Sequence, residues 1–342
     1  MPRKHATTLG RSSVAVTWLS LGTGPIGGMY SAVSDEQASA TIERAWDLGV
    51  RYFDTAPAYG LGESEERLGR ALAKRPRDEY VVATKVGRLL RRDPSPDLAL
   101  DLAAPQLFKS STGLTPVYDY SYDAALLSLE ESLTRLGLDR VDIVYIHDPD
   151  DFYDDALNGA YRALRELREQ GVVGAIGVGM NQAEMLTRFA REAEFDCFLI
   201  AGRYTLLDQR AREELIPTCE ELGISLVAAG VFNGGILADP EKRPVFDYAP
   251  AQPEVLARAK AIDALCREHG VPLAALAVQF PLAEPAYATT LVGACSPEEV
   301  EHNVRAFATA VPAALWDALR NEGLLPRDVA VPGETPDRGV RA

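Results

Sequence analysis

The sequence predicts an α/β fold, a (β/α)8 TIM barrel with an N-terminal β-hairpin and long βα loops. Apolar, strand-like runs alternate along the chain with amphipathic helical segments. Eight such strand–helix units occupy about 290 residues, which is the size typical of this barrel. Runs such as 81–84 and 199–201 are apolar on both faces, as expected when helices cover a parallel sheet.

Each element has a sequence signal of its own. Residues 7–17 favour a hairpin with Gly10 and Arg11 in its turn, and Ser34 and Ser296 mark two helix starts. Strands are expected at residues 18–22, 51–54, 80–85, 141–147, 173–178, 195–201, 225–229 and 289–292. Helices are expected at residues 35–48, 63–74, 122–136, 153–170, 182–193, 208–222, 253–268 and 297–308, with further helical pieces at 272–283 and 312–321.

Two connections are too long to be simple turns, at residues 86–120 and 230–252. Both follow a strand and precede a helix, so both are expected over the C-terminal mouth of the barrel, where such folds bind their ligands. No linker divides the chain, which predicts a single domain over residues 1–322. Prolines and glycines after Gly323 predict a poorly ordered tail over 323–342.

Composition excludes several classes of partner. The 342 residues are 47% hydrophobic and 25% charged, as in ordinary globular proteins. The formal net charge of -15 opposes nucleic-acid binding, which needs clustered Lys and Arg. No apolar run approaches the roughly 18–20 residues of a membrane span, so no membrane partner is expected. The oligomeric state is not predicted.

The cysteines and the first residues indicate a reducing compartment. Residues 1–8 lack an apolar segment, so no secretory signal is expected. Four cysteines are widely spaced and form no CxxC pair, which argues against a disulfide framework or a zinc site. A cytoplasmic location is therefore expected. The four are interpreted as small buried hydrophobes: Cys197, Cys219, Cys266 and Cys295.

Ionisable side chains gather at the expected ends of three successive strands. Asp54 ends one strand and Tyr59 follows in a Pro- and Gly-rich turn, Lys85 ends the next, and His147 ends the one after. The C-terminal ends of barrel strands converge on one pocket, so these side chains are expected to meet there. Each alone could be an ordinary polar group, but the four together predict a site.

These four residue types suit proton transfer to or from an alcohol or carbonyl oxygen. A tyrosine has an unperturbed pKa of about 10, and the Lys85 ammonium is expected to lower the pKa of Tyr59. A buried ammonium needs a carboxylate, which Asp54 supplies. A neutral His147 can orient the reacting oxygen. Because no covalent nucleophile is evident, hydride transfer with a cofactor is the expected chemistry.

Residues 51–69 (RYFDTAPAYGLGESEERLG), together with the strand ends Thr84-Lys85 and Ile146-His147, resemble the aldo-keto reductase superfamily. The resemblance extends from the N-terminal hairpin to residues 293–296. It implies that Tyr59 is the general acid/base, tuned by Lys85 and Asp54, and that His147 positions the substrate oxygen. It also implies a nicotinamide cofactor, NAD or NADP, bound extended across the barrel mouth.

The resemblance further implies where the cofactor lies. Asn181 would hold the carboxamide, although Gly179 and Met180 precede it where the family usually has a serine next to the asparagine. Tyr204 would stack beneath the nicotinamide, residues 231–237 would cover the pyrophosphate, and residues 293–303 would form the adenosine site. The expected cofactor contacts are Gly22, Thr23, Asn181, Tyr204, Val231, Asn233, Gly235, Gly293, Cys295, Ser296, Glu299 and Asn303.

NAD is the expected cofactor. Members that prefer NADP commonly carry Arg or Lys where this chain has Cys295 or Ser296, and Glu298 and Glu299 would repel a 2′-phosphate.

Residues 118–123, 147–150 and 177–182 narrow the resemblance to one branch, that of L-fucose (D-threo-aldose) and L-galactose dehydrogenases and pyridoxal 4-dehydrogenases. This implies oxidation of an aldose at C1 to a lactone. A pyridoxal 4-dehydrogenase-like or broad aldehyde/ketone oxidoreductase is the alternative. In either case the partner is a small-molecule sugar or aldehyde.

Three other interpretations compete with an oxidoreductase barrel. Residues 22–27 fit G-x-G-x-x-G, but Pro25 interrupts the turn and no helix begins before Ser34, so a loop lining the pocket is favoured over a dinucleotide motif.

The second alternative is a barrel that binds the cofactor and reports redox state without catalysis. No separate interaction segment in the sequence supports it.

A metal-dependent hydrolase is the third alternative. His147 with Asp54 and the aspartates at 148, 150 and 151 could supply ligands. However, no H-x-H follows the first strand, and a metal site would leave Tyr59 and Lys85 without a role. No metal is therefore predicted.

Overall fold

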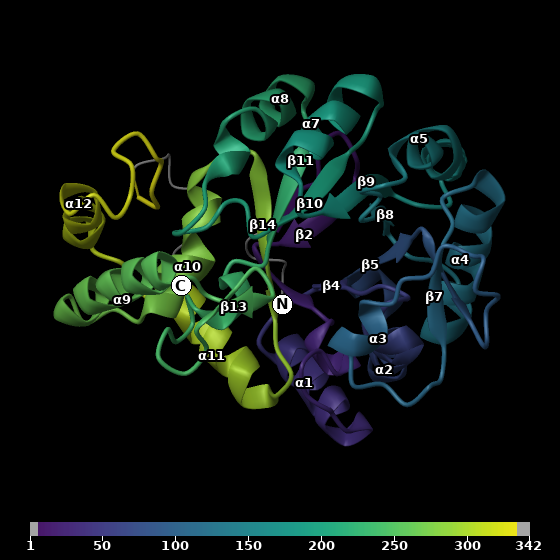
Figure 1. Cartoon of the computed structure of the whole chain (residues 1–342), viewed down its shortest axis with the longest axis horizontal. Helices are drawn as coiled ribbons and strands as arrows, with labels where there is room; N and C mark the ends of the chain where they lie inside the picture. Colours follow the sequence, from purple (N-terminus) through teal and green to yellow (C-terminus); the bar gives the residue numbers. More distant parts are fainter. Residues whose placement is uncertain (1–5, 334–342) are drawn as a thin grey trace.

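The computed structural model describes residues 6–333 and contains a closed barrel of eight parallel strands (Figure 1). Neighbouring strands follow one another in the chain, and the last pairs with the first. The predicted barrel is confirmed. Its strands are β3 (Leu19–Gly22), β4 (Tyr52–Asp54), β5 (Val81–Val86), β8 (Ile143–His147), β9 (Ala175–Met180), β10 (Cys197–Ala201), β11 (Ser225–Ala229) and β14 (Tyr287–Gly293).

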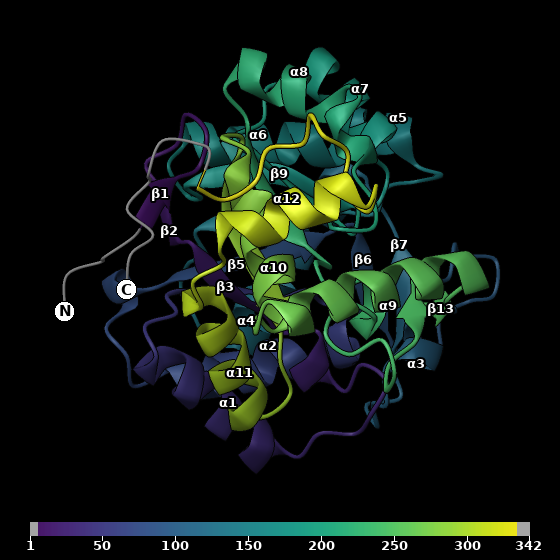
Figure 2. The same cartoon turned by 90° about the vertical axis from the view of Figure 1, so that its left-hand side faces the viewer.

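Helices surround the barrel on the outside (Figures 1 and 2). Two of them, α9 (Pro253–Glu268) and α12 (Ala313–Asn321), contact one another on one flank. The others are α1 (Asp35–Asp47), α2 (Glu63–Leu72), α3 (Ala104–Leu107), α4 (Tyr122–Leu136), α5 (Tyr153–Asp155), α6 (Tyr161–Glu169), α7 (Ala183–Glu192), α8 (Leu215–Leu222), α10 (Leu273–Gln279) and α11 (Pro297–Ala308).

Prolines explain where two helices differ from their predicted bounds. The helix expected at 208–222 begins only at Leu215, because Pro217 is tolerated in a first turn but not in a helix interior. The helix expected at 272–283 changes into a 3-10 turn at Phe280, next to Pro281. A π-helical turn, Ala156–Ala160, also joins α5 to α6.

The N-terminal hairpin closes the end of the barrel opposite the strands' C-termini. It consists of β1 (Ala6–Thr8) and β2 (Ala15–Thr17), as expected from the sequence. Leu9, Val14 and Val16 pack with inward-facing apolar residues of the barrel strands. Because apolar side chains fill this end, polar groups and ligands have room only at the other end.

Both long connections contain strands that the sequence analysis treats as loop. Residues 86–120 form an antiparallel hairpin of β6 (Arg88–Arg91) and β7 (Thr115–Tyr118), with α3 between them. Residues 230–252 include the short hairpin of β12 (Val245–Phe246) and β13 (Ala249–Pro250). The long connections are therefore folded structures at the barrel mouth.

The chain after α12 packs on the barrel as far as residue 333. Leu325, Val329 and Val331 are at most 2% exposed, which differs from the expectation of poor order from Gly323 onward. Residues 334–342 of the expected tail lie outside the described residues. Of the cysteines, three are buried and Cys295 is half-buried. Within residues 6–333, no helix is long and apolar enough to cross a membrane.

We predict that Gly69→Ala destabilises the protein although alanine favours helices. Gly69 lies where α2 meets the end of α4, and a Cβ there would lie 1.9 Å from the carbonyl oxygen of Leu136. Such overpacking typically costs about 1–3 kcal/mol. Urea unfolding should show this loss, whereas Glu66→Ala on the exposed face of α2 should change stability by less than about 0.5 kcal/mol. A Gly69→Ala variant as stable as the wild type would contradict this packing.

Candidate active site

Side chains from three neighbouring strands meet at the C-terminal end of the barrel. β4, β5 and β8 pair in this order, and Asp54, Lys85 and His147 stand at or next to their last positions. The Nζ atom of Lys85 lies 2.6 Å from Asp54 Oδ2 and donates a second hydrogen bond, 2.8 Å long, to the carbonyl of Thr55. Lys85 and Asp54 are each 1% exposed, so this ion pair is buried.

Tyr59 lies beside this ion pair. The Nζ atom of Lys85 is 4.7 Å from the centre of the Tyr59 ring. The imidazole of His147 meets the same ring edge-on, with 5.7 Å between ring centres and 86° between planes. The structure thus brings together all four side chains that the sequence singled out.

Glycines hold the turn that carries Tyr59. Gly60 has a φ of 61°, and a Cβ there would lie 2.4 Å from the carbonyl oxygen of Gly27. A side chain at Gly27 would in turn lie 2.9 Å from the backbone nitrogen of Gly60. The turn after β4 therefore rests directly on the backbone of the loop after β3, a contact that only glycines permit.

Burial raises the pKa of Tyr59 well above its usual value, and the charges of Asp54 and Asp148 add to this rise. Lys85 was expected to lower this pKa. The structure differs first because the phenol is buried, and second because the Asp54 carboxylate, which binds Lys85, raises the pKa further. Tyr59 is therefore protonated in this structure and can act as a proton donor.

His147 is held as a neutral imidazole. Burial lowers the pKa of His147 well below its usual value, and the positive charges of Arg88 and Lys85 lower it further. Its Nε2 atom lies 3.4 Å from Asp148 Oδ2. Its Nδ1 atom has no hydrogen-bond partner among the described residues. A neutral imidazole can orient an oxygen without adding charge to the site.

Arg88 is a central residue that the sequence analysis did not identify. It is 6% exposed, although it belongs to a connection that the sequence analysis treats as loop. Its guanidinium donates to Asp101 Oδ2 at 2.9 Å, to the carbonyl of His147 at 3.1 Å and to Asp148 Oδ2 at 3.2 Å. Arg88 thus connects the β6–β7 hairpin to the catalytic end of β8. An arginine next to Gly87, directly after an active-site strand, was the available signal.

Tyr120 supports the same strand end from outside. Its hydroxyl lies 2.6 Å from the carbonyl oxygen of His147 and 2.8 Å from that of Asp148. This approach requires Gly87, where a Cβ would lie 2.2 Å from the Tyr120 ring.

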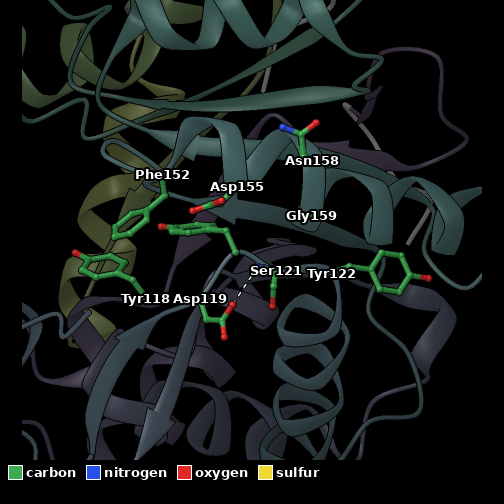
Figure 3. Close-up of a pocket in the computed structure, with 9 residues that line it drawn as sticks. Tyr118, Asp119, Ser121, Tyr122, Phe152, Asp155, Asn158 and Gly159 are labelled. Carbon is green, nitrogen blue, oxygen red and sulfur yellow. Dashed lines mark hydrogen bonds between the residues drawn. The ribbon is translucent and has the colours of Figure 1, made fainter. Parts of the chain in front are cut away.

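A surface cavity of about 450 Å³ lies between Tyr118, Ser121 and Phe152 (Figure 3), and Tyr120 also lines it. Phe152 stacks on Tyr118 at one end of it, with 5.3 Å between ring centres. None of the four residues predicted from the sequence lines this cavity, so it is separate from the reacting centre. Its lining residues are Tyr118, Asp119, Tyr120, Ser121, Tyr122, Phe152, Asp155, Asn158 and Gly159.

The two long connections supply aromatic residues to the barrel mouth. Phe108, from the first, packs on Tyr59 with 5.7 Å between ring centres. Tyr248, from the second, is 56% exposed and has a φ of 65°. Phe108 and Tyr248 were not predicted as site residues.

The expected adenosine end of the cofactor site is a capped helix start. Ser296 accepts a hydrogen bond from the backbone nitrogen of Glu299 at α11, and Glu299 Oε2 accepts one from the backbone nitrogen of Cys295 at 2.8 Å. Asn303 donates to the carbonyl of Gly293. Five of the predicted cofactor residues therefore form one local structure: Gly293, Cys295, Ser296, Glu299 and Asn303. Within it, the Glu299 carboxylate already accepts the hydrogen bond of a backbone N–H.

Asn233 shows that the loop after β11 fits a ligand. Asn233 is 3% exposed, its Nδ2 donates to the carbonyl of Gly202, and its Oδ1 has no partner among the described residues. It adopts a φ of 48°, and Gly234 and Gly235 follow with φ of 87° and 122°. Strained backbone and an unpaired buried amide oxygen are typical of a ligand clamp. Val231, in the same loop, is buried.

The remaining predicted cofactor residues fall into two groups. Gly22 ends β3 and Thr23 follows it beside Asp54, where the Thr23 hydroxyl donates to the Asp54 carbonyl. Asn181 follows β9, and its carbonyl accepts from Arg203. These three residues lie at strand ends around the mouth.

The structure gives Tyr204 a role different from the expected one. Its ring is 2% exposed and stacks on both Phe280 and Tyr287, while its hydroxyl donates to Glu284. This packing leaves no open ring face for a nicotinamide. Across the described part of the chain, no group of three or more His, Cys, Asp or Glu residues could hold a metal ion.

Comparisons with known proteins agree with this geometry. A family model described as "Aldo/keto reductase family" matches residues 18–321. The pyridoxal 4-dehydrogenase of Microbacterium luteolum is 41% identical over 333 residues, covering 93% of this chain and 97% of that protein. The D-threo-aldose 1-dehydrogenase of a Pseudomonas species is 42% identical over 318 residues, covering 92% and 96%.

A solved structure is also similar over most of the chain. It is an aldo-keto reductase from Bacillus halodurans in its holo form, with a TM-score of 0.73 and 26% sequence identity. The match covers 96% of this chain and 98% of that one.

We predict that His147 makes the protein less stable in mild acid. The folded state keeps the imidazole neutral, whereas the unfolded chain binds a proton below about pH 6.5. Stability is therefore present above this pH and is lost as the pH falls, by about 1.4 kcal/mol per unit for one proton.

Urea unfolding at pH 7.5 and 5.5 should show a smaller difference in His147→Gln than in the wild type. His269→Gln, at an exposed position, should keep the wild-type difference. An unchanged difference in His147→Gln would contradict a neutral buried imidazole.

Proposed function

Because this chain belongs to the aldo/keto reductase family, we propose that it oxidises an aldose at C1 to the lactone, with NAD as cofactor. The class of the reaction is shown by the family and by the dehydrogenase relatives: the protein is an oxidoreductase that acts on CH–OH or C=O groups. It uses a nicotinamide cofactor, as its family does. The choice of an aldose and of NAD is the proposal.

The buried Lys85–Asp54 pair beside Tyr59 and a neutral His147 is the observation that carries this function. His147 Nε2 can hydrogen-bond the reacting oxygen and orient it toward the Tyr59 hydroxyl. Tyr59 gives its proton to a carbonyl oxygen in reduction and takes the proton of the anomeric hydroxyl in oxidation. Since burial raises the pKa of Tyr59, oxidation should accelerate as the pH rises.

The cofactor would lie across the barrel mouth between the predicted residues. Asn181, Asn233 and the start of α11 would hold it, with the free Oδ1 of Asn233 available to a donor. A nicotinamide bound there would supply the hydride acceptor for the oxidation. The chain itself holds the substrate oxygen, moves the proton and excludes water with its two long connections.

The substrate assignment is supported by the relatives and by the polar mouth. Relatives named for D-threo-aldose and for pyridoxal are about equally similar, so identity alone does not separate the two substrates. An aldose offers several hydroxyls, and polar side chains such as Asp148 and Tyr248 are accessible at the mouth. Pyridoxal or a simple aldehyde is the second candidate, favoured by the ring of Phe108 over Tyr59.

NAD is proposed because Glu299 occupies the helix start that a 2′-phosphate would need. Its carboxylate accepts a hydrogen bond from the backbone N–H of Cys295, and it lies 3.8 Å from the guanidinium of Arg243. Arg243 is the nearby cation, and Glu299 already balances its charge. A phosphate at this position would meet the Glu299 carboxylate and lose a backbone donor.

The proposed function is tested by following NADH absorbance with a panel of aldoses, pyridoxal and simple aldehydes. We expect aldoses to give the highest kcat/KM with NAD. We expect Tyr59→Phe to lower kcat by about 10²- to 10⁴-fold, because it removes the proton carrier, and to leave NAD affinity unchanged. Highest kcat/KM with pyridoxal would support the second candidate. Near-normal turnover by Tyr59→Phe would refute the assigned role of Tyr59.

We predict that Glu299→Gln shifts the cofactor preference toward NADP. Removing the carboxylate charge should raise the NADP-to-NAD ratio of kcat/KM by about tenfold, since a close charge contact contributes about 1.4 kcal/mol at a partly buried position. The matched control is Glu298→Gln, which should change the ratio less, because Glu298 is exposed and solvent screens its charge. A wild-type preference for NADP, or an unchanged ratio in Glu299→Gln, would contradict this explanation of the preference.

A further inference from the structure

Asp148 lies beside the reacting centre and has no role in the mechanism described so far. Its Oδ2 atom is 3.4 Å from Nε2 of His147, the atom that would orient the substrate oxygen. After burial and the charge of Asp54, the charge of Asp148 also raises the pKa of Tyr59. The side chain is 34% exposed, so a ligand in the mouth can reach it.

The cluster that holds Asp148 contains one more carboxylate than cation. Arg88 pairs with both Asp101 and Asp148. Asp101 is satisfied, because its Oδ2 binds Arg88 and its Oδ1 accepts the backbone N–H groups of Ala103 and Ala104. Within residues 6–333, Arg88 alone donates to Asp148, and it does so on Oδ2. A carboxylate offers about four acceptor positions, so Oδ1 is free to bind a donor.

The backbone fixes the direction of this carboxylate. Asp148 has a φ of 41°, a left-handed conformation that is uncommon for residues other than glycine. The N–H of Asp148 donates to the carbonyl of Gly179 at 2.9 Å, and the carbonyl of Asp148 accepts a hydrogen bond from the Tyr120 hydroxyl at 2.8 Å. Strained residues that several neighbours hold in place are typical of ligand-binding positions. The carboxylate is therefore preorganised next to His147.

We infer that Asp148 is a specificity-determining residue whose Oδ1 accepts a hydrogen bond from the substrate hydroxyl on the carbon next to the reacting one. This rests on the proposed function, in which the reacting oxygen lies between Tyr59 and His147. Because Asp148 is adjacent to His147 Nε2, it reaches the neighbouring carbon of the substrate rather than a distant one. It selects 2-hydroxy carbonyl compounds and aldoses over aldehydes that lack this hydroxyl.

The test compares two aldehydes that differ only in this hydroxyl. We measure kcat/KM for the reduction of lactaldehyde and of propanal with NADH, in the wild type and in Asp148→Gly. Glycine removes the carboxylate and tolerates the positive φ. The wild type should prefer lactaldehyde by about 10- to 100-fold, which is the typical effect of a hydrogen bond to a charged group. In Asp148→Gly, the ratio of kcat/KM for lactaldehyde to kcat/KM for propanal should be close to one.

Asp101→Asn is the matched control. This variant also removes a carboxylate that pairs with Arg88, but Asp101 is 5% exposed and faces α3 rather than the mouth. It should keep the wild-type ratio, even if both rates fall. If Asp148→Gly does not fold, Asp148→Asn replaces it and should give an intermediate ratio, because the amide is a neutral and weaker acceptor.

Three results would overturn the inference. They are a wild-type ratio near one, an unchanged ratio in Asp148→Gly, and an equal loss of the ratio in Asp101→Asn. The reduction of lactaldehyde can be measured even if the protein oxidises no aldose. The aldose assignment and the role of Asp148 can therefore be refuted independently. A protein that prefers lactaldehyde through Asp148 but oxidises no aldose would refute the aldose assignment and retain the role of Asp148.

Discussion

The buried ion pair between Lys85 and Asp54 is the interaction on which the site depends. Taking two charges out of water costs several kcal/mol each, so such a pair contributes little net stability. Breaking it leaves one charge unpaired in the barrel, which is much less favourable. The pair therefore acts mainly as a geometric constraint. It keeps an ammonium close to the Tyr59 ring and lets the barrel accommodate a lysine that is 1% exposed.

Arg88 extends this constraint to the long connection after β5. By binding Asp101 within the connection and both Asp148 and the carbonyl of His147 at the end of β8, it joins two segments about 60 residues apart in the chain. Its charge also helps to keep His147 neutral, after burial, which is the larger cause of the lowered pKa. The β6–β7 hairpin is thus coupled to His147, the residue proposed to orient the substrate, and to Asp148, the residue proposed to select it.

Much of the fold and the reacting centre could be predicted because both depend on local patterns. Strands that are apolar on both faces, serine caps such as Ser34, and glycines near Tyr59 can be recognised in the sequence. The residues 86–120 could not be assigned in the same way, since β6 carries Arg88 and Arg91 and lacks the apolar character of the barrel strands. Tyr204 was misjudged because the resemblance implied its position but not its packing between Phe280 and Tyr287.

The sequence by itself determined which chemical groups stand at the ends of successive strands, because parallel strands in a barrel must all end at one mouth. Asp54, Tyr59, Lys85 and His147 followed from that rule. Only the tertiary structure decided their electrostatics, because a pKa depends on burial and on distances between residues remote in sequence. It gave the Tyr59 phenol a raised pKa instead of a lowered one. It also placed Arg88 and Asp148 beside His147, whereas the sequence alone showed Arg88 as a loop residue and Asp148 only as a possible metal ligand.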